Sequence, residues 1–131
     1  MTDGDVLFQY RHRQAQECLA EAKQMVQQQT FTTRTIVNRA YYACFYGLLA
    51  LFLRTAVHLK TSKHIGVITI FDRDFVLAGK IDKKYSETIH RLFKARQDAD
   101  YKELVSPTIE QAIVYVNMAD DFLSAIEKLF N

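Results

Sequence analysis

An arginine and a histidine occupy helical positions that a packed bundle normally fills with apolar residues. Arg96 ends a stripe at four- and three-residue spacing that also contains Tyr85, Ile89 and Leu92. His64 begins a second such stripe, which continues with Ile68, Phe71 and Phe75. A neutral histidine can act as a general base, and an arginine can hold a phosphate. Together they are a minimum set for metal-independent RNA cleavage, in which the 2′-hydroxyl is the nucleophile.

The order of the helices predicts which other residues share this site. If consecutive helices alternate in direction, the start of the helix with His64 and the end of the helix with Arg96 lie at the same end of the molecule. We therefore expect a site with His64 and Arg96 as its catalytic residues. A nucleotide- or RNA-binding pocket is expected from Arg96, Asp100, Tyr101 and Lys102, in which Arg96 contacts phosphate, with Asp98 nearby. Arg39, which precedes an apolar run, is expected at the opposite end.

A structural role is the alternative for each of these residues. Arg96 near a helix C-terminus is favourably placed in the helix dipole, and His64 at a helix start can be a half-buried polar end residue. A metal site is not expected. Glu87 and His90 form one Glu-x-x-His pair, whereas a di-iron bundle needs two. The sequence also has no glycine-rich phosphate loop, and we expect no cofactor.

Five helical segments are predicted to position these residues in one domain, residues 1–131. They are expected at about 5–29, at about 34–57, from after Ser62 to near Gly79, from after Asp82, and from Ser106-Pro107 onward. The segment Ile65–Ile70 is β-branched but has no strand to pair with, so helix is preferred. Short connections between amphipathic helices predict an all-α, up-and-down antiparallel bundle with four main helices and one shorter helix.

Composition supports a helical fold and gives a weak signal for phosphate binding. The 131 residues are 49% hydrophobic and 24% charged, with one Pro and four Gly, too few for a many-stranded β fold. The formal net charge is +2. However, residues 54–102 contain 11 basic and 6 acidic side chains. This asymmetry indicates a basic face that could meet phosphates, or else an ordinary mixed surface.

The apolar run Ala40–Leu53 is 14 residues long, shorter than the roughly 20 that cross a bilayer, so it predicts a buried core helix. Cys18 and Cys44 are expected to be buried free thiols in a reducing cytoplasm. No signal peptide is expected.

The apolar run Ala40–Leu53 also carries an aromatic cluster that either packs in the core or forms an interface between subunits. The residues expected at that interface are Arg39, Tyr41, Tyr42, Phe45 and Tyr46.

Three segments in the right order resemble the HEPN superfamily, and most closely its small stand-alone UPF0332-like branch. They are the residues Asn38–Phe45 (NRAYYACF), His64–Val67 with Phe71 (HIGV…F), and Arg96–Tyr101 (RQDADY). The match extends over nearly the whole chain, and the combination is more specific than RAYYA alone.

The resemblance implies an all-α bundle that forms a homodimer and is encoded beside a minimal nucleotidyltransferase. Such pairs resemble toxin–antitoxin modules, in which the HEPN member is a ribonuclease and the nucleotidyltransferase neutralises it. HEPN ribonucleases carry Arg, four to six residues, then His. Here Arg96 matches the arginine, but no histidine lies in that window, and Arg54 to His58 is one residue too close. The alternatives are therefore a partner-binding module, a metal-independent endoribonuclease toxin with His64 as base, and a non-catalytic structural oligomer.

Overall fold

The structure is a computed structural model that describes residues 2–60, 63–101 and 106–131, and within them the chain is all-helical. The helices are α1 (Asp3–Gln28), α2 (Thr33–Arg54), α3 (His64–Phe71), α4 (Lys84–Tyr101) and α5 (Ile109–Glu127). A π-helical turn, Asp72–Val76, continues α3, and a 3-10 turn, Lys128–Phe130, ends the chain. The predicted fold class is confirmed, including a helix for Ile65–Ile70.

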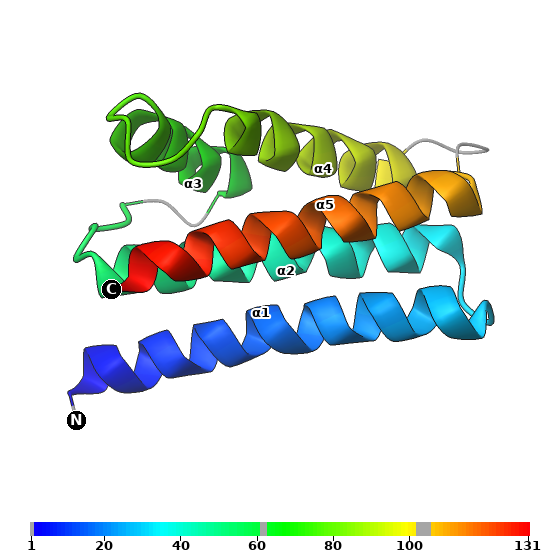
Figure 1. Ribbon diagram of the computed structural model, residues 1–131, viewed down its shortest axis with the longest axis horizontal. Coiled ribbons are helices and arrows are strands. Elements are labelled where there is room, and N and C mark those ends of the chain that lie inside the picture. Colours follow the sequence, from blue (N-terminus) through cyan, green and yellow to red (C-terminus); the bar gives the residue numbers. More distant parts are fainter. Residues whose placement is uncertain (1, 61–62, 102–105) are drawn as a thin grey trace.

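Four long helices run along the length of the molecule, and α3 is a short helix beside the start of α4 (Figure 1). Consecutive long helices alternate in direction, so the end of α4 lies beside the start of α2. Helix α2 is the centre of the bundle, because it packs against α1, α3, α4 and α5. Its contact with α1 is the most extensive of these.

The buried surface of α2 explains its unusually apolar composition. By length and hydropathy alone, Thr33–Arg54 could cross a membrane, but 67% of its most apolar stretch is buried inside the bundle. Its side chains from Ile36 to Phe52 account for much of the core, and Cys44 is a buried free thiol among them. A helix that is buried over most of its surface needs little polar surface, and α2 is the core helix that the sequence predicted.

The N-terminus of α5 differs from the expected one. Thr108, and not Ser106, is the N-cap: its hydroxyl accepts a hydrogen bond from the backbone N–H of Gln111 at 3.1 Å. The Gln111 side chain in turn accepts from the backbone N–H of Thr108 at 2.9 Å, which completes a capping box. Ser106 instead accepts a hydrogen bond from Arg34 Nε on α2. A reciprocal pair satisfies two backbone donors, whereas a cap at Ser106 would satisfy one.

Thr108→Ala is expected to lower the free energy of unfolding by about 1 kcal/mol, because the backbone N–H of Gln111 then loses its acceptor. Urea denaturation followed by circular dichroism measures this difference. Thr108→Ser keeps the hydroxyl and is the matched control. If Ser106→Ala costs more stability than Thr108→Ala, Thr108 is not the functional cap.

The ends of the segment around α3 agree with expectation where they are described. Gly79 has a positive φ of 76°, the left-handed conformation that favours glycine. The backbone N–H of Gly79 donates to Val76 and that of Lys80 donates to Phe75, which is a Schellman ending. Asp82 accepts from the Lys84 backbone N–H at the start of α4. Ser62, the expected N-cap of α3, lies outside the described residues.

Candidate functional site

His64 lies against the middle of α2, where it contacts buried aromatic residues. Its Nδ1 is 2.8 Å from the hydroxyl oxygen of Tyr41. The imidazole stacks on Phe45, with ring centres 4.1 Å apart and planes 13° apart. It also meets the ring of Tyr42 edge-on at 5.7 Å. Since α3 begins at this residue, the first turn of a short helix fixes the imidazole on the core helix.

Arg96 of α4 reaches the same aromatic residues. Its guanidinium carbon lies 5.6 Å from the ring centre of Tyr41 and 5.4 Å from that of Tyr42. Nε is 3.0 Å from a carboxylate oxygen of Asp100, four residues later on the same helix. This buried Nε nevertheless makes no aligned hydrogen bond with the described residues, so the pair is held by charge. His64 and Arg96 therefore converge on the rings of Tyr41 and Tyr42.

The expected position of Arg39 is wrong, because this residue lies beside Arg96 and not at the opposite end. Its guanidinium carbon is 5.8 Å from the ring centre of Tyr42, the same ring that Arg96 contacts. The reason is that α4 is antiparallel to α2, so the last turns of α4 meet the first turns of α2. Helix α3 is short and starts against the middle of α2, which brings His64 to the same place.

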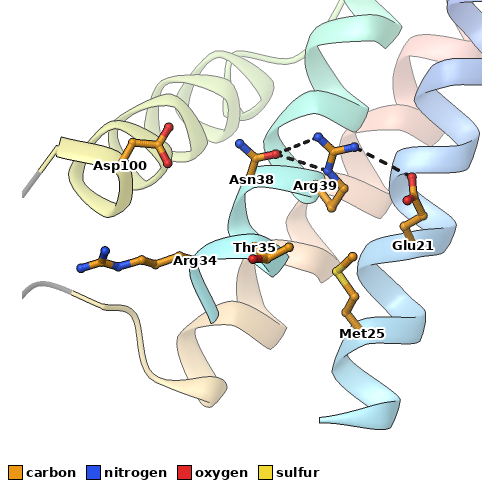
Figure 2. Close-up of a pocket in the computed structure, with 7 residues that line it drawn as sticks. All are labelled: Glu21, Met25, Arg34, Thr35, Asn38, Arg39 and Asp100. Carbon is orange, nitrogen blue, oxygen red and sulfur yellow. Dashed lines mark hydrogen bonds and ion pairs between the residues drawn. The ribbon is translucent and has the colours of Figure 1, made fainter. Parts of the chain in front are cut away.

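We call the group formed by these side chains the two-arginine site; its members are Arg39, Tyr41, Tyr42, His64, Arg96 and Asp100. It extends into an open, polar pocket of about 440 Å³ between α1, the start of α2 and the end of α4 (Figure 2). Arg39 and Asp100 line both the site and the pocket. The other residues that line the pocket are Glu21, Met25, Arg34, Thr35 and Asn38.

Within the pocket, Arg39 is held by its neighbours. Its Nε and Nη2 donate to the side-chain oxygen of Asn38, and its Nη1 is 4.0 Å from Glu21 on α1, as Figure 2 shows. Sequence reasoning missed Glu21, Arg34, Thr35 and Asn38 as pocket residues. Arg34, Thr35 and Asn38 share a face by their three- and four-residue spacing, but no pattern in the sequence places Glu21 opposite them.

The electrostatics of the site favour the neutral forms of His64 and Tyr41. Burial lowers the pKa of His64 below its ordinary value, and the positive charge of Arg96 lowers it further. Burial raises the pKa of Tyr41 well above its ordinary value, which Arg96 only partly offsets. At neutral pH the site therefore holds a neutral imidazole, a protonated phenol and two guanidinium groups.

The remaining expected site residues occupy different surroundings. Tyr41 has no exposed surface and Phe45 has 7%, so both are core residues, which is the packing alternative for the aromatic cluster. Arg39, Tyr42 and Tyr46 are half-buried. Tyr101 is 76% exposed, and Lys102 lies outside the described residues. Asp98 pairs with Lys94 at 3.2 Å on the surface of α4.

His90 of the Glu-x-x-His pair contacts a carboxylate on another element. Its Nε2 is 2.6 Å from Asp72, at the start of the π-helical turn. No group of three His, Cys, Asp or Glu side chains that could hold a metal occurs in the described part of the chain. The contact between His90 and Asp72 joins α4 to the π-helical turn that follows α3.

Comparison with known proteins places the chain in a family. The model of the HEPN domain matches residues 8–129. A UPF0332 protein of Thermotoga maritima is 40% identical over 129 residues, which are 98% of this chain and 95% of the relative. Two proteins of Methanocaldococcus jannaschii are also similar. "Putative toxin MJ0605" is 36% identical over 87% of this chain and 81% of its own length. "Putative toxin MJ0142" is 32% identical over 70% of this chain and 61% of its own length.

The match covers almost all of the described helices, from the first turns of α1 to the final 3-10 turn, and so includes every described member of the two-arginine site. The all-helical fold agrees with it. The chain belongs to the HEPN domain family.

Proposed function

We propose that this protein is the toxin component of a toxin–antitoxin module and that it binds phosphates of RNA, or of a nucleotide, at the two-arginine site. One observation carries the proposal: Arg39 and Arg96 both lie within 6 Å of the ring centre of Tyr42, next to His64. Guanidinium groups bind phosphate oxygens through paired N–H donors, so two of them around one tyrosine ring concentrate positive charge where a phosphate can bind. The toxin names of two relatives support the biological setting.

The proposal includes a homodimer in the cytoplasm and a minimal nucleotidyltransferase that neutralises the toxin. The HEPN resemblance supports both partners. Half-buried Arg39, Tyr42 and Tyr46 could contribute to an interface, because each keeps some side chain accessible. The exposed Tyr101 would extend the binding surface from the end of α4, and Lys102, the next residue in the sequence, is included in the proposal for its charge. A small nucleotidyltransferase gene next to the gene for this protein, and co-purification of the two products, would support the pairing; failure to associate would contradict it.

Arg96→Ala is expected to weaken the binding of a short single-stranded RNA by about 10- to 100-fold, because a charged contact to phosphate is lost. Fluorescence anisotropy with labelled RNA measures the dissociation constant, and the slope of affinity against salt should fall by about one. Arg91→Ala is the matched control. Arg91 lies on the same helix but contacts Tyr115, away from the site. Equal losses in both variants would show that only general positive charge matters.

RNA cleavage is the second candidate function, favoured by the proximity of His64 and Arg96 to the same Tyr41 ring. Purified protein incubated with RNA and EDTA distinguishes the two. Cleavage that is lost in both His64→Ala and Arg96→Ala supports an endoribonuclease, whereas RNA binding without cleavage supports a binding module. A purely structural oligomer predicts that neither RNA nor nucleotide raises the melting temperature.

A further inference from the structure

We propose that Tyr41 holds His64 as the neutral tautomer with its proton on Nε2, so that His64 acts in the two-arginine site as a hydrogen-bond donor and not as a general base. The identity of its acceptor, a phosphate oxygen, rests on the proposed function. The tautomer itself follows from the contacts of Tyr41 and does not depend on any ligand.

The first step concerns the hydrogen of the Tyr41 hydroxyl. Tyr41 is completely buried, so its hydroxyl cannot donate to bulk water. Among the described residues, the hydrogen-bond partner of that hydroxyl is Nδ1 of His64, at 2.8 Å. A buried donor without an acceptor costs free energy, so the favoured arrangement has Tyr41 donating to an unprotonated Nδ1. The opposite arrangement, with Nδ1–H donating to Tyr41, would leave the hydroxyl hydrogen without an acceptor in the described structure.

The second step concerns the other ring nitrogen. A neutral imidazole has one N–H and one bare nitrogen, so a bare Nδ1 places the proton on Nε2. Nε2 has no hydrogen-bond partner in the described part of the chain, yet it is not one of the buried unpaired polar atoms. His64 is half-buried, and the atom that reaches solvent is therefore Nε2–H. A ligand in the site meets a donor at this position.

The third step concerns the charge of the ring. Among the described residues, its charged and titratable neighbours are Tyr41 and Tyr42 from α2, Arg96 from α4, and the exposed Lys63 that precedes it. None of these is a carboxylate. A proton added at Nδ1 would displace the tyrosine hydrogen and stand near the positive charge of Arg96. The imidazole therefore stays neutral, with Nδ1 occupied and unable to accept a proton from a substrate.

This arrangement gives the site a division of roles. His64 supplies a neutral donor and Arg96 a charged donor, and both suit the oxygens of a phosphate. Asp100 is then the anionic acceptor of the site, and it is paired with Arg96 before any ligand binds. Tyr41 acts only through His64 and is a positioning residue.

Nitrogen-15 spectra of the histidine rings test the tautomer without any ligand. In the wild-type protein, Nδ1 of His64 should have a pyridine-type shift and Nε2 a pyrrole-type shift at neutral pH, with His64→Gln identifying the signals. The reverse pattern would overturn the proposal. Tyr41→Phe keeps the buried ring and removes the donor, so it should raise the pKa of His64, because the neutral form loses a hydrogen bond. A fall in that pKa would show that Nδ1–H was the donor.

Tyr42→Phe is the matched control, because Tyr42 packs against His64 without a hydrogen bond to it in the described structure, and it should leave both the tautomer and the pKa unchanged. If Tyr41→Phe does not fold, the wild-type spectrum still decides the tautomer.

Binding of the short RNA separates this inference from the proposed function. Glutamine at position 64 retains an N–H donor but cannot take up a proton. His64→Gln is therefore expected to bind RNA within about threefold of wild type, whereas His64→Ala loses about tenfold. Equal losses in both variants would overturn the donor role. A wild-type protein that binds no RNA, yet shows the Nε2–H tautomer, would contradict the proposed function and support the tautomer assignment.

Discussion

Phe122→Ala is expected to lower the free energy of unfolding by about 3–5 kcal/mol, enough to unfold much of the protein if its stability is ordinary. Phe122 of α5 is completely buried. Its ring meets Phe71 at 5.6 Å and Tyr85 at 6.1 Å, both at steep angles. The side chain thus joins α5 to α3 and α4, and alanine would leave a cavity that rigid helices cannot fill.

Chemical denaturation monitored by circular dichroism measures this loss, and its slope with denaturant should not change. Phe31→Ala is the control of the same type, because Phe31 lies in the turn between α1 and α2 and is 45% exposed. It should change stability by less than about 0.5 kcal/mol. A cost below 1 kcal/mol for Phe122→Ala would mean that α5 can repack against α3 and α4.

Cys44 is expected to react with thiol reagents at least about 1,000-fold more slowly in the native protein than in the unfolded chain. The thiol is fully buried in α2, and burial raises its pKa far above the ordinary value, so little reactive thiolate forms. Reaction then requires the bundle to open. The rate of alkylation in a Cys18→Ala background, compared with and without denaturant, gives the ratio.

The alkylation rate of Cys18, measured in a Cys44→Ala background, is the comparison for the rate of Cys44 in the same fold. Its sulfur lies 3.9 Å from Nη1 of Arg39, and the positive charge partly offsets the rise in pKa that burial causes. Cys18 should react faster than Cys44 in the native state. Rapid native alkylation of Cys44 would show that α2 is exposed by local opening.

The sequence was sufficient for the helices because they repeat apolar residues at a helical period, except for α2, whose middle is a continuous apolar run. Even the β-branched Ile65–Ile70 followed this rule, and Gly79 ended its segment at a positive φ. The N-cap of α5 is Thr108, two residues later than the predicted Ser106. Serine and threonine can both cap a helix. Gln111, three residues after Thr108, favours Thr108 because it completes a reciprocal pair of hydrogen bonds with it.

Only part of the two-arginine site could be predicted from the sequence. His64 begins one apolar stripe and Arg96 ends another, which marks both residues in the sequence, and in the structure both contact the Tyr41 ring. Alternation of five helices places Arg39 at the opposite end, but α3 is too short to cross the bundle, so α4 runs antiparallel to α2 and Arg39 lies beside Arg96. Glu21 could not be found from the sequence, because its contact with Arg39 depends on how α1 is rotated against α2.

Tyr41 illustrates a different limit. Its sequence neighbours Tyr42, Phe45 and Tyr46 make a cluster that could face a partner or the core, and periodicity does not decide between them on a helix that is apolar all round. The structure buries Tyr41 and turns its hydroxyl to His64. A residue expected at a subunit interface is thereby a candidate for setting the protonation of the site.

The central position of α2 also has a consequence for the newly made chain. Because synthesis proceeds from the N-terminus, α1 and α2 leave the ribosome first and can form their helical hairpin at once. The other sides of α2 stay uncovered until α4 and α5 follow, and the two-arginine site lacks Arg96 and Asp100 until α4 is complete. In a nascent chain, the sides of α2 that α4 and α5 cover therefore stay exposed until those helices emerge, and the two-arginine site is complete only after α4.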